Sequence, residues 1–229
     1  MSGLTGISSM ATRALLASLV TQYARANGVH VHIESVGGVD AAKRVQAGEA
    51  FDIVLLASDA IDRLIVGGYV LAGTRTDWAQ SHVAACVRAG APLPDWSSSA
   101  AVYAAVLAAT TIGVSTGPSG AALLDLFARW GIGETVAARL ITTAPGVPIA
   151  SLVARGEVEL GFQQRSELHD VPGIVVIGAL PADCAITTAF SSAVVKSCTQ
   201  PAVAAAFLQF LVTPNIAALK QAHGMQSVV

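Results

Sequence analysis

One short segment has the residue pattern of a nucleophilic serine. Gly113-Val-Ser-Thr-Gly117 matches G-x-S-x-G after a predicted strand, and Asp183 and His223 follow it in the order found in α/β-hydrolases. In such enzymes a histidine takes the proton of the serine hydroxyl, and a carboxylate orients the histidine. The pattern indicates a serine hydrolase that uses Ser115. Against this hypothesis, Pro118 adds a turn where the helix of the nucleophile should begin, and no H-G-G-G segment precedes it.

A second pattern consists of small, mostly uncharged residues where a predicted strand ends and a helix begins. Helix N-termini expose unpaired N–H groups at the positive end of the helix dipole, and small residues allow an anion to approach them. Such a site can hold an oxyanion or a carboxylate without Lys or Arg. The same residues also serve as ordinary caps and turns, so both interpretations stay open. The candidate ligand-binding residues at these junctions are Ser8, Ser9, Gly37, Gly38, Ser119, Gly120, Gly146 after Pro145, Val147, Gln163 and Gln164, and Ser58-Asp59 forms a further junction.

A general base is harder to identify from the sequence. Proton transfer next to a carboxylate requires a base within reach of the bound carbon, and His82 is the candidate, although it also fits an ordinary strand histidine. Three scattered cysteines, Cys86, Cys184 and Cys198, form no C-x-x-C pair and are expected to be buried thiols. Without a metal-binding, P-loop or dinucleotide motif, we expect neither a metal site nor a cofactor.

The composition restricts the partners of the chain. The net charge is −2, and the 13 Lys and Arg residues form no basic run, so nucleic acid is not an expected partner. Apolar runs such as 53–57 are far shorter than the roughly 20 residues of a membrane span, so membrane insertion is not expected either. The N-terminus has no basic and apolar segments of a signal peptide, which predicts a cytoplasmic protein. A periplasmic chain from which a signal peptide had been removed would have the same sequence.

The predicted elements that must position these residues alternate between strand and helix. Hydrophobic residues make up 53% of the chain, which is typical of a buried parallel sheet flanked by helices. The first third is expected to form a βαβαβα unit, and the loop at 91–95 is expected to mark the crossing into a second lobe with the same alternation. The predicted strands are 4–7, 29–33, 52–57, 82–88, 111–115, 140–143, 158–162, 174–177 and 186–196. The predicted helices begin at 8, 40 and 58 and span 98–109, 119–130, 147–154, 201–212 and 216–223.

Three segments together resemble the periplasmic molybdate-binding protein family of type 2 solute-binding proteins. They are Gly6-Ile-Ser-Ser-Met-Ala-Thr12, Ala42-Lys-Arg-Val-Gln-Ala-Gly-Glu-Ala-Phe-Asp-Ile-Val-Leu-Leu-Ala57 and Leu152-Val-Ala-Arg-Gly-Glu-Val-Glu-Leu-Gly-Phe-Gln-Gln164, in an order that covers nearly the whole chain. The resemblance implies the type 2 periplasmic-binding-protein fold, with two α/β lobes, two hinge strands and a ligand cleft between the lobes. It implies a discontinuous first lobe of 1–80 plus 190–229 and a second lobe of 81–189. For an exported chain it also implies an ABC-transporter permease as a partner.

The resemblance assigns roles to several of the candidate residues. Ser9 matches a hydroxyl that donates to the oxyanion in the family, Gly38 stands where the family has a second serine, and Gln164 stands where it has a tyrosine. Because two side chains are changed, the amides of Gln163 or Gln164 favour a larger carboxylated ligand over tetrahedral molybdate or tungstate. The matches to backbone donors are Ser119 and either Gly146 or Val147.

Three functions therefore stay open at the level of the sequence. The chain is expected to bind a small oxyanion or carboxylate in the cleft between the lobes, as a solute-binding protein of an ABC-transporter type. Alternatively, it is an isomerase of an unsaturated di- or tricarboxylate such as aconitate, because it resembles those relatives of the molybdate-binding group in having glutamines where the transporters have tyrosine. The third alternative is the serine hydrolase that uses Ser115.

Overall fold

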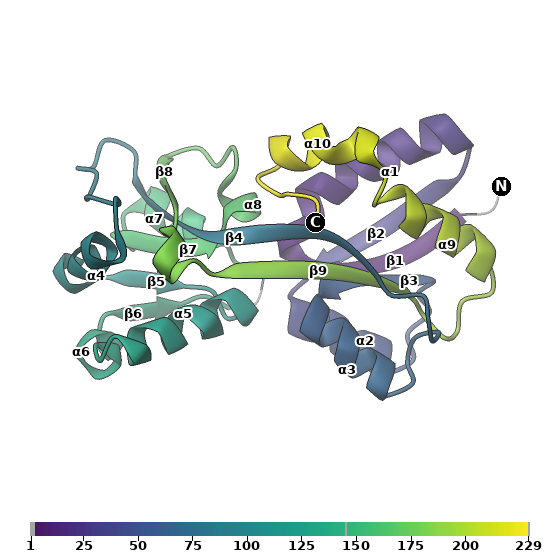
Figure 1. Ribbon diagram of the computed structural model, residues 1–229, viewed down its shortest axis with the longest axis horizontal. Helices are drawn as coiled ribbons and strands as arrows, with labels where there is room; N and C mark the ends of the chain where they lie inside the picture. The colour runs from purple at the N-terminus through teal and green to yellow at the C-terminus, as the bar shows by residue number, and fades with distance from the viewer. Residues whose placement is uncertain (1–2, 145, 229) are drawn as a thin grey trace. The chain divides into compact units, whose positions relative to one another are not determined.

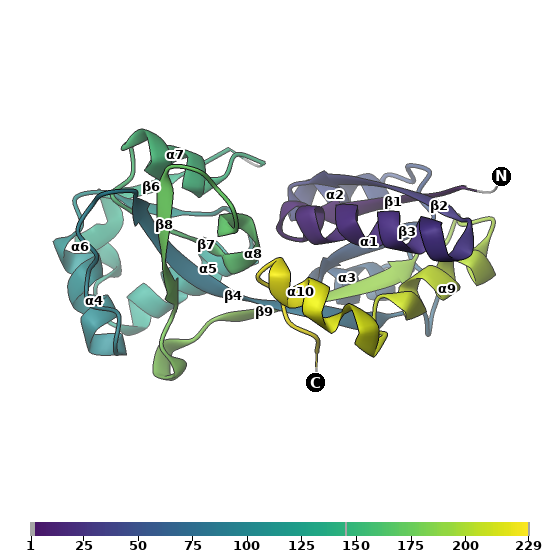
Figure 2. The same ribbon diagram turned by 90° about the horizontal axis from the view of Figure 1, so that it is seen from above.

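The chain forms two compact α/β units in the computed structural model, which describes residues 3–144 and 146–228 (Figures 1 and 2). The first unit runs to Gln80 and resumes at Ala189, and the second spans Ser81–Thr188. Strands β4 (Thr76–Arg88) and β9 (Thr187–Val194) each pass from one unit into the other.

The predicted crossing at 91–95 is wrong, because these residues lie within the second unit. The crossing takes place inside β4, whose residues Trp78 and Ala79 pack in the core of the first unit while Val83 and Ala85 pack in the core of the second. A single continuous strand carries no Pro or Gly at the crossing, so the sequence has no breaker there to mark it.

The sheet of the first unit is mixed. Strands β1 (Gly3–Ser9), β2 (His30–Val36) and β3 (Ile53–Ala57) are parallel in the order β2-β1-β3, which confirms the parallel pairing predicted for the first third. The last strand, β9, adds to β3 in the antiparallel direction. Because β1, β2 and β3 are parallel, their carboxyl ends lie at one edge of the sheet.

Helices cover both faces of this sheet. Strand residues alternate between the faces, so Ile53 and Leu55 pack against α1, α9 and the C-terminal residues, while Val54 and Leu56 pack against α2 and α3. Figure 1 shows α1 and α9 on one side of the strands and α2 and α3 on the other. The first helix ends at Gly28, whose φ of +68° lies in the left-handed region that favours glycine. The helices of this unit are η1 (Met10–Thr12), α1 (Arg13–Asn27), α2 (Gly38–Gln46), α3 (Ser58–Val66), α9 (Pro201–Phe210), η3 (Pro214–Ile216) and α10 (Ala217–Ala222).

Within the described residues, no single helix has both the length and the apolar character to cross a membrane. The two helical segments 201–210 and 214–222 reach that length and composition only when they are taken together, across a bend of 57°.

One lysine is buried inside the first unit. Lys220 of α10 is 1% exposed, and its Nζ donates hydrogen bonds to the backbone carbonyl of Trp78 and to Ser227 Oγ. Burial lowers the pKa of Lys220 to about 8. These bonds hold the C-terminal helix on the first half of β4.

The second unit is built around three parallel strands. Strands β6 (Leu140–Thr142), β5 (Ile112–Val114) and β7 (Leu160–Gln164) are parallel neighbours, and the second half of β4 pairs antiparallel with β7 and with β8 (Ile174–Ala179). Two apolar clusters cover the two faces, one with α4 and α5 and the other with α7. The helices are α4 (Ser99–Ala108), α5 (Pro118–Arg129), α6 (Gly133–Ala137), α7 (Ile149–Arg155), α8 (Arg165–Leu168) and η2 (Ala182–Cys184).

The cysteines lie mostly in apolar surroundings. Cys86 and Cys184 are buried, and desolvation raises the pKa of Cys86 to about 12. Cys198 is only partly buried, so the prediction of three buried thiols is wrong for this residue, which follows the last strand in a turn.

The start of α5 depends on a close backbone approach. Gly117 is the N-cap, Pro118 occupies the first turn, and a Cβ atom at Gly120 would lie 1.7 Å from the carbonyl oxygen of Ser115. No side chain fits at that distance, so Gly120 allows the helix to begin directly against the end of β5.

We predict that Gly120→Ala lowers the free energy of unfolding by at least about 2 kcal/mol, because the added methyl group forces the helix away from Ser115. The matched control is Gly117→Ala, where a Cβ would meet nothing within 4 Å, and we expect it to cost no more than about 1 kcal/mol. Urea unfolding of both variants measures the difference, and equal losses would contradict the assignment.

Candidate functional site

In the first unit, the carboxyl ends of the parallel strands bring Ser9 beside the start of α2. Ser9 ends β1 opposite Val36, and a Cβ atom at Gly38 would lie 3.7 Å from the Cβ of Ser9. The Ser9 side chain is 9% exposed, and its Oγ has no hydrogen-bond partner among the described residues. A buried hydroxyl without a partner loses free energy relative to water, so this oxygen is suited to a ligand.

Two neighbouring candidates of the first unit, Ser8 and Gly37, form hydrogen bonds within the fold. Ser8 is fully buried, and its hydroxyl lies 2.8 Å from Ser35 Oγ, which ties β1 to β2. The carbonyl of Gly37 accepts the N–H of Ala41, the first hydrogen bond of α2. Ser8 therefore contributes to the sheet, and Gly37 contributes to the helix start.

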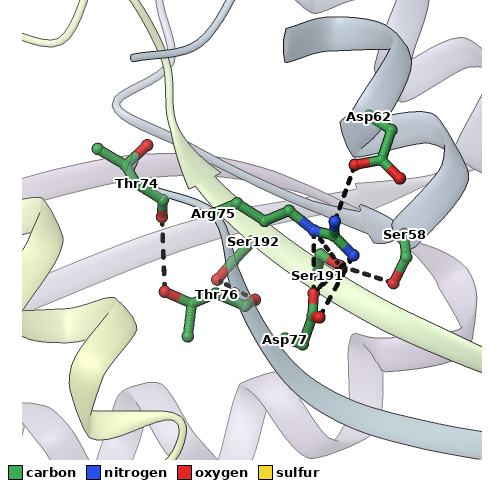
Figure 3. A network of polar contacts seen from close by, with 8 residues as sticks. All are labelled: Ser58, Asp62, Thr74, Arg75, Thr76, Asp77, Ser191 and Ser192. Carbon is green, nitrogen blue, oxygen red and sulfur yellow. Dashed lines mark hydrogen bonds and ion pairs between the residues drawn. The ribbon is translucent and has the colours of Figure 1, made fainter. Parts of the chain in front are cut away.

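A network of polar contacts holds the junction at Ser58 (Figure 3). Arg75 forms ion pairs with Asp62 and Asp77, each at 3.0 Å, and Ser191 Oγ lies 2.5 Å from Asp77 Oδ1 and 2.6 Å from Ser58 Oγ. The guanidinium is therefore neutralised by two carboxylates, and the Ser58 hydroxyl is engaged inside the unit.

In the second unit, a small depression lies at the carboxyl ends of β5 and β7. These strands are in register at Val114 and Phe162, which places Ser115 and Gln163 next to each other at the ends. The two hydroxyls of Ser115 and Ser119 lie 3.2 Å apart. The depression is shallow and is lined by Val83, Ser115, Ser119, Gly120, Leu123, Phe162 and Gln163.

Two buried glutamines end strand β7. Gln163 is 4% exposed, and its Oε1 accepts the N–H of Ala150 at 3.3 Å. Gln164 is 3% exposed, its Nε2 donates to Thr188 Oγ1 at 2.5 Å, and its Oε1 has no partner among the described residues. Both side chains offer hydrogen bonds without formal charge at the end of the strand.

A carboxyl group that sequence reasoning missed lies three residues after Gln164. Glu167 belongs to the four-residue helix α8, is half-buried, and forms a side-chain hydrogen bond with Gln163. Desolvation raises the pKa of Glu167 to about 7, and the hydrogen bond from Gln163 opposes part of this rise. A four-residue helix is too short for an apolar period, so the only signal in the sequence is an acidic residue between Gln164 and the buried Leu168.

The remaining candidates differ in what they can donate. The N–H of Gly120 bonds to the carbonyl of Gly117, so Gly120 contributes through its missing side chain. Gly146 and Val147 are exposed, and the N–H of Val147 donates to the carbonyl of Ala144. Pro145, which precedes them, lies outside the described residues.

The predicted hydrolase residues each hydrogen-bond a different serine. Ser115 pairs with Ser119, Asp183 accepts the hydroxyl of Ser99, and His223 Nε2 lies 3.0 Å from Ser18 Oγ. None of these three hydrogen bonds joins two members of the set Ser115, Asp183 and His223. The geometry therefore gives no support to the serine hydrolase.

The predicted base His82 also has a partner. It is half-buried in β4, and its Nδ1 lies 2.8 Å from Thr187 Oγ1. Among the residues that the structure describes, no group of three or more His, Cys, Asp or Glu side chains could hold a metal ion.

Comparison with known proteins identifies the family. The model of the family described as bacterial extracellular solute-binding proteins matches residues 4–226. The chain belongs to this family. It is similar to an aconitate isomerase from a Pseudomonas species, with 34% identity over 231 residues that cover 98% of this chain and 88% of the relative.

Solved structures support the fold assignment. The periplasmic molybdate-binding protein of Azotobacter vinelandii superimposes with a TM-score of 0.81 at 20% identity, with 99% of each chain covered. The sulfate-binding protein of Mycobacterium tuberculosis H37Rv gives a TM-score of 0.79 at 18% identity, with 100% of this chain and 88% of that chain covered. The type 2 periplasmic-binding-protein fold expected for this family member is thus confirmed.

We predict that Ser9→Ala leaves the free energy of unfolding of the ligand-free protein unchanged or raises it by about 1 kcal/mol, because it removes a buried hydroxyl without a partner. The adjacent control Ser8→Ala should lower it by about 1 kcal/mol, because it breaks the bond to Ser35. Urea unfolding compares the two, and a similar loss in both variants would contradict the assignment of Ser9.

We predict a pH dependence of stability that arises from Glu167. Because its pKa in the folded state lies above the usual 4.5, the folded protein binds more protons than the unfolded chain, and stability falls as the pH rises from about 4.5 to about 7. Glu167→Gln should remove this fall, so the variant should gain stability relative to the parent between pH 5 and pH 8. Urea unfolding at several pH values measures it, with the exposed Glu134→Gln as the matched control. Parallel pH profiles for the parent and Glu167→Gln would refute the prediction.

Proposed function

We propose that this protein binds a small polycarboxylate and isomerises it, with an unsaturated acid such as aconitate as substrate. The observation that carries the proposal is the pair of buried amides at the end of β7: Gln163 lines the depression with Ser115 and Ser119, and Gln164 has a buried Oε1 without a partner among the described residues. These groups supply hydrogen bonds to an anion without formal positive charge.

The chemistry of the amides favours a carboxylated ligand. Molybdate and sulfate present only acceptor oxygens, whereas a polycarboxylic acid that retains one proton presents acceptors and a donor. Gln164 offers an unpaired acceptor, and rotation of its amide by 180° would let the Thr188 hydroxyl donate to Oε1 and turn Nε2 toward the ligand. Either orientation suits a ligand with carboxyl groups.

The similarity to an enzyme supports the proposal that the protein isomerises its ligand. The relative named aconitate isomerase shares 34% of its residues with this chain across 98% of the chain's length. The molybdate- and sulfate-binding structures share 20% and 18%. Isomerisation of an unsaturated acid moves one proton and one double bond, which the side chains of a protein can perform by acid–base catalysis.

We predict that the purified protein interconverts cis- and trans-aconitate, which proton NMR follows directly. The same acids should raise the melting temperature, together with citrate as a saturated analogue, because a ligand that binds only the folded state stabilises it. Ser9→Ala in the first unit and Gln164→Leu in the second should each weaken binding by about tenfold, the loss expected for one hydrogen bond to a charged group. An effect of only one variant would assign the anion to that unit alone, and unchanged spectra for a panel of unsaturated acids would exclude the isomerase.

A second candidate function is that of a carrier. It is favoured by the match to the solute-binding protein family over residues 4–226. In this case the ligand would be a small oxyanion, the location periplasmic and the partner an ABC-transporter permease. Stabilisation by molybdate, tungstate or sulfate without any turnover of aconitate would favour the carrier over the enzyme.

A further inference from the structure

Glu167 is a partly buried carboxyl group that hydrogen-bonds Gln163, one of the candidate ligand-binding residues. It lies in α8, which follows β7 without a gap and packs against it. An ionised carboxylate would repel an anionic ligand, so its presence next to the buried glutamines is unfavourable for a protein that only binds anions. Its place in the fold therefore calls for a chemical role.

Gln163 connects this carboxyl group to the depression. The Oε1 of Gln163 is fixed by the N–H of Ala150 at 3.3 Å, which leaves the amide N–H₂ to donate to Glu167. Gln163 also lines the depression together with Ser115 and Ser119. Glu167 is thus held by one of the residues that would contact a bound acid.

Among the described residues, no charged group contributes to the pKa shift of Glu167. Strand β7 carries no ionisable residue, and the contact between β4 and α8 is made by Ser81 and Ser166, whose hydroxyls lie 3.5 Å apart. Arg155 of α7, which packs on β7, pairs with Glu157 at 2.5 Å, and Arg165 of α8 itself is exposed. Burial without a cation brings the pKa of Glu167 to about 7, where a carboxyl group can both accept and release a proton.

We propose that Glu167 is the catalytic acid–base of the isomerisation and that Gln163 is the residue that positions it. This inference rests on the isomerase function proposed above. Glu167 would take a proton from the CH₂ carbon between a carboxylate and the C=C bond, and it would return the proton at the far carbon of the double bond.

The step is balanced without a further reactant. The C–H bond at the CH₂ carbon breaks, and its electron pair forms the new C=C bond. The electron pair of the old C=C bond forms a C–H bond with the proton that Glu167 returns. Glu167 ends as the carboxylate, and the vinylic carbon that forms can adopt either geometry, which interconverts cis and trans acids.

The test compares Glu167→Gln with the parent protein by turnover of aconitate and by binding of the same acid. We expect kcat to fall at least about 100-fold, the contribution typical of general acid–base catalysis, while the dissociation constant changes less than threefold. Below about pH 7 the parent's kcat/KM should fall as Glu167 is protonated, and the residual activity of the variant should lack this dependence. The exposed Glu134→Gln is the matched control and should keep the parent's rate.

The outcomes separate this inference from the proposed function. If the parent converts aconitate and Glu167→Gln does so within tenfold, or if the variant loses binding while kcat is kept, the role of Glu167 is overturned and the isomerase stands. A larger loss of kcat in His82→Asn than in Glu167→Gln would assign the proton transfer to His82 instead. If the parent converts no unsaturated acid, the isomerase function fails and the catalytic role of Glu167 fails with it.

Discussion

Polar groups that are buried without a partner make a protein less stable, and the candidate site of this chain depends on that constraint. Ser9 Oγ and Gln164 Oε1 are both buried without a hydrogen-bond partner in the part of the chain that the structure describes. Most buried polar atoms in folded proteins are paired, so these exceptions call for an explanation. Trp78 Nε1 is also without a partner, but it lies in the core of the first unit, whereas the other two atoms lie at strand ends. Both atoms belong to residues at the carboxyl end of a parallel strand, where α/β proteins bind their ligands.

Both units present uncharged polar groups at the carboxyl ends of their parallel strands. In each unit, parallel strands bring hydroxyls or amides to one edge, beside the start of a helix. In the second unit, Gly120 is needed for the helix to begin against Ser115, whereas in the first unit a side chain at Gly38 would make only an ordinary contact with Ser9. The side chains that supply these hydrogen bonds are uncharged. Arg75, a cation of the first unit, is neutralised by Asp62 and Asp77.

Where the hydrogen-bond donors of a site are neutral, a nearby carboxyl group can titrate near neutral pH, because no cation holds it ionised. An arginine close to Glu167 would hold its carboxyl group ionised and lower its pKa, whereas burial beside the amide of Gln163 raises it. The absence of charge at the glutamines and the protonation behaviour of Glu167 therefore have the same physical origin. The uncharged glutamines would therefore serve both to bind a carboxylate and to keep Glu167 able to transfer a proton.

The sequence by itself determined the α/β class, most of the strands and helices, the family and the small polar residues at the strand ends, because periodicity, glycine breakers and short motifs are local properties. Only the tertiary structure decided which of these polar groups are free. Ser8 and Ser9 are adjacent and of the same type, yet one bonds to Ser35 and the other has no partner, since neighbouring residues of a strand point to opposite faces. Tertiary packing also placed the crossing inside β4, bonded His223 to Ser18 and desolvated the carboxyl group of Glu167. These outcomes depend on contacts between residues far apart in the chain, which no local pattern encodes.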